Sequence, residues 1–250
     1  MGQKHNVLAL LLLLSSSLAG CFSDDTPDSI ISLVVDTGNE DWMLVESYSE
    51  GELISATNVS IDFDFSQTRA DNKLITYGID TMDGRSPITT NAESNSIIIV
   101  EFNNHGVYNV SAYAIDENNL QQQITIMIQI NLRIEWAESD THEPKALTFN
   151  PIPVNGGPNP KMIEINSLVE NPSLIEDVGS GGQSVQITWQ IVDELDNVCQ
   201  KKKIQIEDGD EKNWYTIHFN TFLVHELMIT YDEGQDNINV NQTIAILYDS

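Results

Sequence analysis

Short segments in which polar and apolar residues alternate recur along this chain of 250 residues. Residues 58–65 (Asn-Val-Ser-Ile-Asp-Phe-Asp-Phe) give a clear example, because every second side chain is apolar. Successive side chains of a β-strand point to opposite faces, so a period of two is typical of a strand with one buried face. No segment of the sequence shows a sustained helical period with capping residues. The sequence therefore predicts an all-β protein.

Further strand-like segments are separated by polar turns. They lie at residues 30–35, 74–79, 96–102, 107–115, 123–134, 184–192, 201–207, 214–222, 226–231 and 239–248. Several short strands at regular spacing favour an antiparallel sandwich. A proline-rich stretch over residues 140–160 interrupts the pattern, and residues 133–136 read as a new strand. We therefore predict two immunoglobulin-like antiparallel β-sandwiches, over residues 30–132 and 133–250.

The N-terminus resembles the signal of a prokaryotic lipoprotein, archaeal lipoproteins in particular. Lys4 supplies a positive charge, residues 7–14 are apolar, and Leu18-Ala19-Gly20-Cys21 resembles a lipobox. The resemblance implies that residues 1–20 are a signal peptide and that Cys21 carries lipid. Residues 21–29 would then be an acidic tether, and the chain would sit outside the cytoplasm at the cell surface. The apolar stretch is shorter than the roughly 20 residues of a membrane-spanning helix, so lipid is the expected anchor.

Residues 58–132 resemble a PKD domain, an immunoglobulin-like module of cell-surface proteins. Residues 77–84 (Tyr-Gly-Ile-Asp-Thr-Met-Asp-Gly) are similar to the family's Trp-Asp-Phe-Gly-Asp-Gly stretch, with Tyr77 in place of the usual Trp. Residues 102–116 are similar to its Gly-x-Tyr-x-Val stretch. We expect Gly106 to adopt a positive φ and Tyr108 to form a tyrosine corner. Tyr77 and Ile79 are expected to face the Tyr108 strand from the opposite sheet.

The net charge of -27 disfavours nucleic acid and anionic lipid headgroups as partners. The three consecutive lysines at 201–203 are the only basic run after the signal peptide, and we interpret them as a solvent-facing edge strand that discourages further pairing.

Cysteines are sparse, so no internal disulfide is expected. If Cys21 is lipidated, Cys199 is left alone. His218 and His225 lie downstream, but nothing in the sequence places them beside Cys199, and the alternation around His218 predicts a solvent-facing side chain. Catalytic and zinc motifs are absent from the sequence, so we nominate no catalytic residue and expect no transition-metal site.

Two turns carry carboxylates that are candidate calcium ligands. The pairs are Asp80 with Asp83, and Asp208 with Asp210. A solvated turn is the expected state of each, so no cofactor is expected and calcium is the one candidate. Three asparagines, Asn58, Asn109 and Asn241, begin Asn-x-Ser/Thr sequences and are candidate glycosylation sites if the host modifies its surface proteins in this way.

These observations favour a lipid-anchored cell-surface protein that is not an enzyme. Its role would be binding, adhesion or spacing, with an extracellular protein or a glycan as partner. An alternative is a substrate-capturing lipoprotein that serves a transporter or a secreted hydrolase. The alternative predicts a concave pocket with convergent aromatic residues, for which the four tryptophans are candidates.

Overall fold

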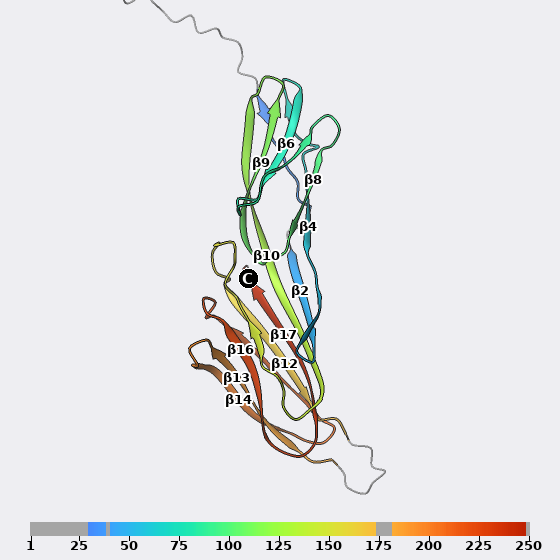
Figure 1. The fold of residues 1–250 in the computed structure, drawn as a ribbon, viewed down its shortest axis with the longest axis vertical. Coiled ribbons are helices and arrows are strands. Elements are labelled where there is room, and N and C mark those ends of the chain that lie inside the picture. Colours follow the sequence, from blue (N-terminus) through green and yellow to red (C-terminus); the bar gives the residue numbers. More distant parts are fainter. Residues whose placement is uncertain (1–29, 39–40, 174–181, 249–250) are drawn as a thin grey trace, which may run out of the picture. The chain divides into compact units, whose positions relative to one another are not determined.

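The structure is a computed structural model that describes residues 30–38, 41–173 and 182–248. These residues form seventeen strands joined by turns, with no helix among them (Figure 1). The predicted all-β class is therefore confirmed. In the described ranges, no helix has the length and apolar character that a membrane crossing requires. The predicted signal peptide, Cys21 and the tether lie outside the described residues, and the described residues from Ile31 onward form one compact unit.

The first sandwich packs two β-layers against each other. One layer contains β6 (Leu74–Asp80), β7 (Ile88–Asn91), β9 (Gly106–Asp116) and the first half of β10 (Gln121–Thr141). The other contains β4 (Val59–Asp64) paired with β8 (Ile97–Phe102). The short β1 (Ile31–Ser32) and β5 (Arg69–Ala70) pair with each other in a separate two-stranded sheet. Alternation produces this packing, because every second residue of β4 and β8 is apolar and buried, while the residues between them, apolar Ile97 and Ile99 of β8 included, are not buried.

Aromatic contacts join the two layers of the first sandwich. The Phe65 ring stacks on Tyr77 with centroids 4.6 Å apart, and Phe102 meets Tyr108 edge-on at 4.8 Å. Tyr77 and Ile79 are buried as expected, but their predicted position was wrong. Their strand β6 pairs directly with β9 in the same sheet, and the layer that faces Tyr108 is β4–β8. Sequence alternation identifies the buried face of a strand but not its partners.

The expected tyrosine corner is confirmed. The Tyr108 hydroxyl donates a hydrogen bond of 2.8 Å to the Asn104 carbonyl oxygen, and the side chain is buried. Gly106, at the start of β9, has a φ of 151°, which favours glycine.

The second sandwich has a six-stranded layer and a four-stranded layer. The larger layer contains β2 (Trp42–Ser49), β3 (Glu52–Ala56), the second half of β10, β12 (Met162–Glu170), β15 (Glu211–His218) and β17 (Ile238–Leu247). The smaller layer is ordered β11 (Leu147–Phe149), β16 (His225–Glu233), β13 (Val185–Asp193) and β14 (Val198–Ile206). The three lysines lie on β14, an edge strand of its sheet, which confirms the edge interpretation.

Trp189 is at the centre of the second core. It is fully buried, as its position within an alternating segment predicted. Its Nε1 donates to Ser167 Oγ of β12 at 2.9 Å, and its ring lies 6.1 Å from the ring of Trp214 on β15. These contacts tie the smaller layer to the larger one.

Strand β10 belongs to both sandwiches. It pairs with β9 over its first half and with β17 over its second half. The predicted division between residues 132 and 133 falls inside this unbroken strand. Strands β2 and β3 come from the part of the chain that was assigned to the first sandwich, but they belong to the second. Strand β2 pairs in parallel with the second half of β10, and β3 pairs with β2.

Candidate functional site

A groove of about 780 Å³ lies on the outer face of the first sandwich. Its floor is formed by the outward side chains of β9 and β10 and by the end of β6. Because strand side chains alternate, the buried Val110, Ala112 and Ala114 leave Ser111 and Tyr113 on the outside. Cross-strand pairing sets Gln123 beside Tyr113, and Thr125 beside Ser111. The buried face of each strand therefore fixes the composition of the groove.

Two loops form the sides of the groove. One is the turn at residues 81–83, in which Met82 has a φ of 55°. The other is the loop at residues 155–157, from the proline-rich stretch. The Asn155 side chain holds this loop against the first sandwich, because its Nδ2 donates to the Val107 carbonyl oxygen at 2.9 Å while its Oδ1 accepts from Gly157 N at 3.0 Å.

Six polar side chains of the floor make no hydrogen bond to another group in the described part of the chain. They are Asn109, Ser111, Tyr113, Gln121, Gln123 and Thr125. Amides and hydroxyls can each donate and accept, so this floor offers both kinds of group to a ligand.

Tyr113 lies directly over Gly78 on the neighbouring strand. A Cβ atom added at Gly78 would be only 2.1 Å from Tyr113 Cζ, a distance that no side chain tolerates. Glycine at this position therefore allows the ring to lie against the sheet. The ring covers the Gly78 backbone and lines the groove.

Asp80 and Asp83 both line the groove, on either side of residues 81 and 82. The Asp83 carboxylate binds the Arg85 guanidinium, with an Nη2–Oδ2 distance of 2.7 Å, and accepts the Thr81 hydroxyl at 2.7 Å. The hydrogen bond and charge of Arg85 lower the pKa of Asp83 to about 2. Calcium at this pair stays a prediction, and an ion there would compete with Arg85 for the carboxylate.

The other candidate calcium ligands and the candidate glycosylation sites lie on the surface. Asp208 and Asp210 are exposed in the turn between β14 and β15, where Asp210 is paired with Lys212 at 3.4 Å. Asn58, Asn109 and Asn241 are all exposed, as glycosylation requires, and modification itself stays a prediction. Asn109 lines the groove, so a sugar attached there would occupy it.

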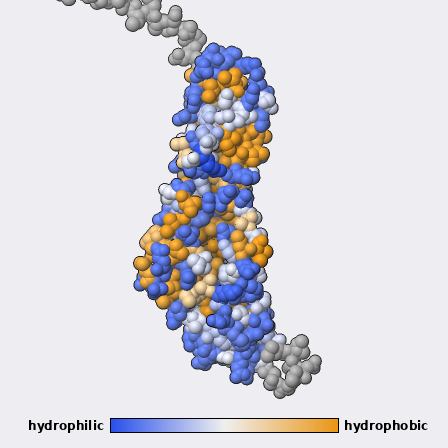
Figure 2. Space-filling model, viewed as in Figure 1, coloured by the Kyte–Doolittle hydropathy of each residue, from blue (hydrophilic) through white to orange (hydrophobic). Residues whose placement is uncertain are grey.

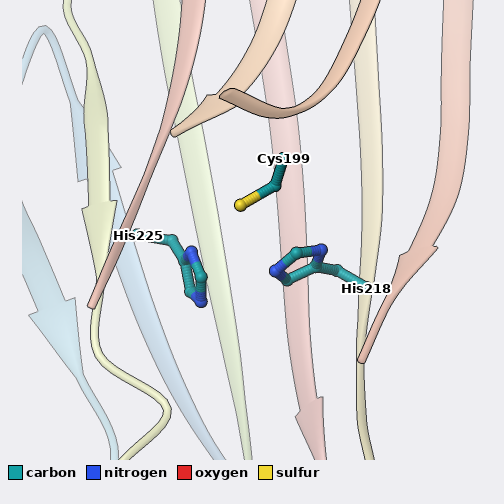
Figure 3. A group of neighbouring side chains, drawn as sticks. All are labelled: Cys199, His218 and His225. Atoms are coloured by element: carbon teal, nitrogen blue, oxygen red, sulfur yellow. The ribbon is translucent and has the colours of Figure 1, made fainter. Parts of the chain in front are cut away.

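The structure also brings together three residues that the sequence left apart. Cys199, His218 and His225 each offer one ligand atom, and these atoms lie within 4.8 Å of one another (Figure 3). The prediction that His218 faces solvent was wrong: its side chain is buried, with 6% of its surface exposed. It ends β15, where it turns inward against His225, and the two ring centroids are 4.6 Å apart.

Burial governs the protonation of this cluster. Desolvation and the neighbouring His225 lower the pKa of His218 to about 4, and desolvation also lowers the pKa of His225. Burial and the Asp193 carboxylate raise the pKa of the Cys199 thiol. An activated cysteine nucleophile requires the opposite shift, so the cluster does not have the electrostatics of a thiolate enzyme.

Neither the groove nor the cluster was found from the sequence. The outward residues of β9 and β10 were readable from alternation, but the sides of the groove come from loops that are distant in the chain. The tryptophans expected in a capture pocket do not line it: Trp136, Trp189 and Trp214 are buried in the core, and Trp42 lies elsewhere.

No protein-family model and no curated protein sequence matches the chain. Carbohydrate-binding modules from the β-sandwich superfamily are 12% identical, with a TM-score of 0.33, over 88% of this chain and 97% of theirs. Fibronectin(III)-like modules of Clostridium thermocellum CbhA are 8% identical, with a TM-score of 0.28, over 80% of this chain and 94% of theirs. Bacteroides ovatus SGBP-B, solved with a mixed-linkage heptasaccharide, is 9% identical, with a TM-score of 0.23, over 83% of this chain and 52% of its own. Likenesses this distant carry no argument about a ligand.

Proposed function

We propose that this protein is a lipid-anchored cell-surface protein that binds neutral glycans, without catalysis, in the groove of its first sandwich. The observation that carries the proposal is the floor of uncommitted amide and hydroxyl groups around the ring of Tyr113. A sugar offers hydroxyl groups that both donate and accept, and an apolar face of C–H groups that packs on an aromatic ring. The groove supplies a partner for each.

Charge narrows the class of glycan. The chain has a net charge of -27, and Asp80 and Asp83 line the groove itself. An anionic sugar would be repelled, so a neutral oligosaccharide is the expected ligand. The volume of about 780 Å³ lies within the range of small-molecule sites, so the groove is large enough for a short oligosaccharide.

Replacing Tyr113 with alanine should weaken glycan binding about tenfold or more, because the ring contributes both stacking and buried area. Binding of the full chain to neutral gluco-, manno-, xylo- and chito-oligosaccharides can be measured by calorimetry. Gly78→Val should have the same effect, since the new side chain would displace the ring.

Tyr215→Ala is the matched control, because this tyrosine is 56% exposed on β15 of the second sandwich, away from the groove. Its affinity should equal that of the wild type. Equal binding by the Tyr113 and Tyr215 variants would contradict the proposal, as would the absence of binding across the panel.

The lipid anchor has its own test at Cys21. Serine cannot form the thioether, so Cys21→Ser should leave the precursor uncleaved or release the protein from the membrane fraction. Cell fractionation and mass spectrometry of the N-terminus report both outcomes. Normal cleavage with unchanged membrane retention would refute the anchor and leave the glycan site untouched.

A further inference from the structure

The strand ends explain why Cys199 and His218 meet. Cys199 is the second residue of β14, and His218 is the last residue of β15, the next strand in the chain. The chain runs away from Cys199 along β14 and back along β15, so the two residues lie at the same end of the sandwich. Strand β16 begins there with His225, which pairs with Asp193 of β13. Because β14 and β15 are edge strands of their two sheets, the cluster lies where the layers open to solvent.

Both histidines present an unused nitrogen inside the protein. His225 Nε2 lies 2.8 Å from the Asn220 carbonyl oxygen and must donate its proton there, which leaves Nδ1 with a free lone pair. That Nδ1 and the Nε2 of His218 are buried and have no hydrogen-bond partner in the described chain. Only 1% of His225 and 6% of His218 is exposed. A buried polar atom without a partner is rare and is paired in most proteins by a water, an ion or a ligand.

Figure 3 shows the Cys199 side chain directed toward the space between the two rings. We propose that Cys199, His218 and His225 bind one late transition-metal ion, zinc or copper. A sulfur and two imidazole nitrogens form a ligand set that these ions prefer over calcium and magnesium, which favour oxygen. Zinc and copper share this ligand chemistry, and the experiment distinguishes them.

The geometry is close to that of a bound site. Bond lengths of about 2.3 Å to sulfur and 2.0 Å to nitrogen place the one sulfur and two nitrogens of a tetrahedral site roughly 3.3 to 3.5 Å apart. The three atoms lie within 4.8 Å of one another, so the widest pair needs to close by no more than about 1.5 Å. Side-chain rotation at the exposed Cys199 can supply this movement, and the same exposure provides an entry path.

The surroundings suit such a site. The Asn220 carbonyl fixes the orientation of the His225 ring, the arrangement commonly found behind a metal-binding histidine. Val198 and Phe219, the sequence neighbours of Cys199 and His218, are exposed hydrophobic residues, and Figure 2 shows that such residues reach the surface in several places. With three protein ligands, a fourth position is open to solvent.

The test is metal binding by the reduced full chain in the presence of excess Ca²⁺ and Mg²⁺, which occupy nonspecific sites on the acidic surface. After dialysis, elemental analysis should find one zinc or copper ion per chain, and the ion retained identifies the metal. Co²⁺ added in place of zinc should show a thiolate charge-transfer band. Cys199→Ser should abolish this band. It should also lower the Zn²⁺ affinity by more than roughly 100-fold, because loss of a residue that only hydrogen-bonds to a ligand already costs roughly 10- to 100-fold.

Two further variants complete the test. His218→Asn should lower the affinity similarly, while His142→Asn, which changes a histidine outside the cluster, should bind as the wild type does. Because Cys199 is exposed, Cys199→Ser should fold even if His218→Asn does not. The proposal is overturned if the wild type retains neither metal against Ca²⁺ and Mg²⁺, or if Cys199→Ser retains the same ion with the same affinity. Neither result bears on glycan binding in the groove.

Discussion

Replacing Trp189 with alanine should lower the free energy of unfolding by about 3 to 5 kcal/mol. The side chain is fully buried between the two layers of the second sandwich, so its removal leaves a large cavity. It also leaves the buried Ser167 hydroxyl without the indole N–H, although Gln242 Nε2 remains 3.4 Å away. Urea denaturation followed by far-UV circular dichroism measures the loss.

Two comparison variants separate the causes. Trp189→Phe keeps much of the apolar volume but loses the hydrogen bond to Ser167, so it should lie between the wild type and the alanine variant. Phe219→Ala removes an aromatic ring that is 69% exposed and should change stability by no more than about 0.5 kcal/mol. A loss of less than about 1 kcal/mol for Trp189→Ala would contradict the central position of this residue in the core.

Replacing Arg133 with proline should lower the free energy of unfolding by about 2 to 4 kcal/mol, because a ladder hydrogen bond is lost and its carbonyl acceptor is left without a donor. Arg133 lies in β10 between Ala245 of β17 and Val45 of β2. Its side chain is exposed, so the dominant effect is the missing backbone N–H and the fixed φ within a strand that has neighbours on both sides. Because β10 continues into the first sandwich, both sandwiches should lose stability together.

Arg133→Ala is the matched control, since it removes the same side chain but keeps the backbone donor; it should be within about 0.5 kcal/mol of the wild type. Tryptophan fluorescence reports the second sandwich, and hydrogen exchange at β9 amides reports the first. Separate transitions, with the first sandwich still at the wild-type midpoint, would show that β10 does not couple them.

Sequence alternation predicted the local elements well. Residues 58–65 became β4, residues 107–115 became β9, and residues 239–248 became β17, each within one or two residues. The buried Tyr108 and Trp189 were also predicted, because burial of a strand face depends on the strand itself. Six strands were missed, namely β2, β3, β5, β7, β11 and β12, although β12 alternates as clearly as those that were recognised.

Partner choice could not be predicted, because it depends on residues far apart in the chain. The parallel pairing of β2 with β10 has no local signal, and neither has the position of β6 beside β9. The Cys199 cluster shows the same limit. A solvent-facing His218 was inferred from its immediate neighbours, but its burial is set by His225, which enters from another sheet.

The close approach of Tyr113 to Gly78 means that the residues at these two positions are expected to change together in evolution. A descendant that keeps the Tyr113 ring in its present position must keep glycine at 78, because a Cβ atom there would lie 2.1 Å from Tyr113 Cζ. A descendant that loses the ring is released from that requirement, and a β-branched residue would then suit the strand better. Paired change at 78 and 113 would therefore mark lineages that have abandoned the groove, even where the sandwich itself is retained.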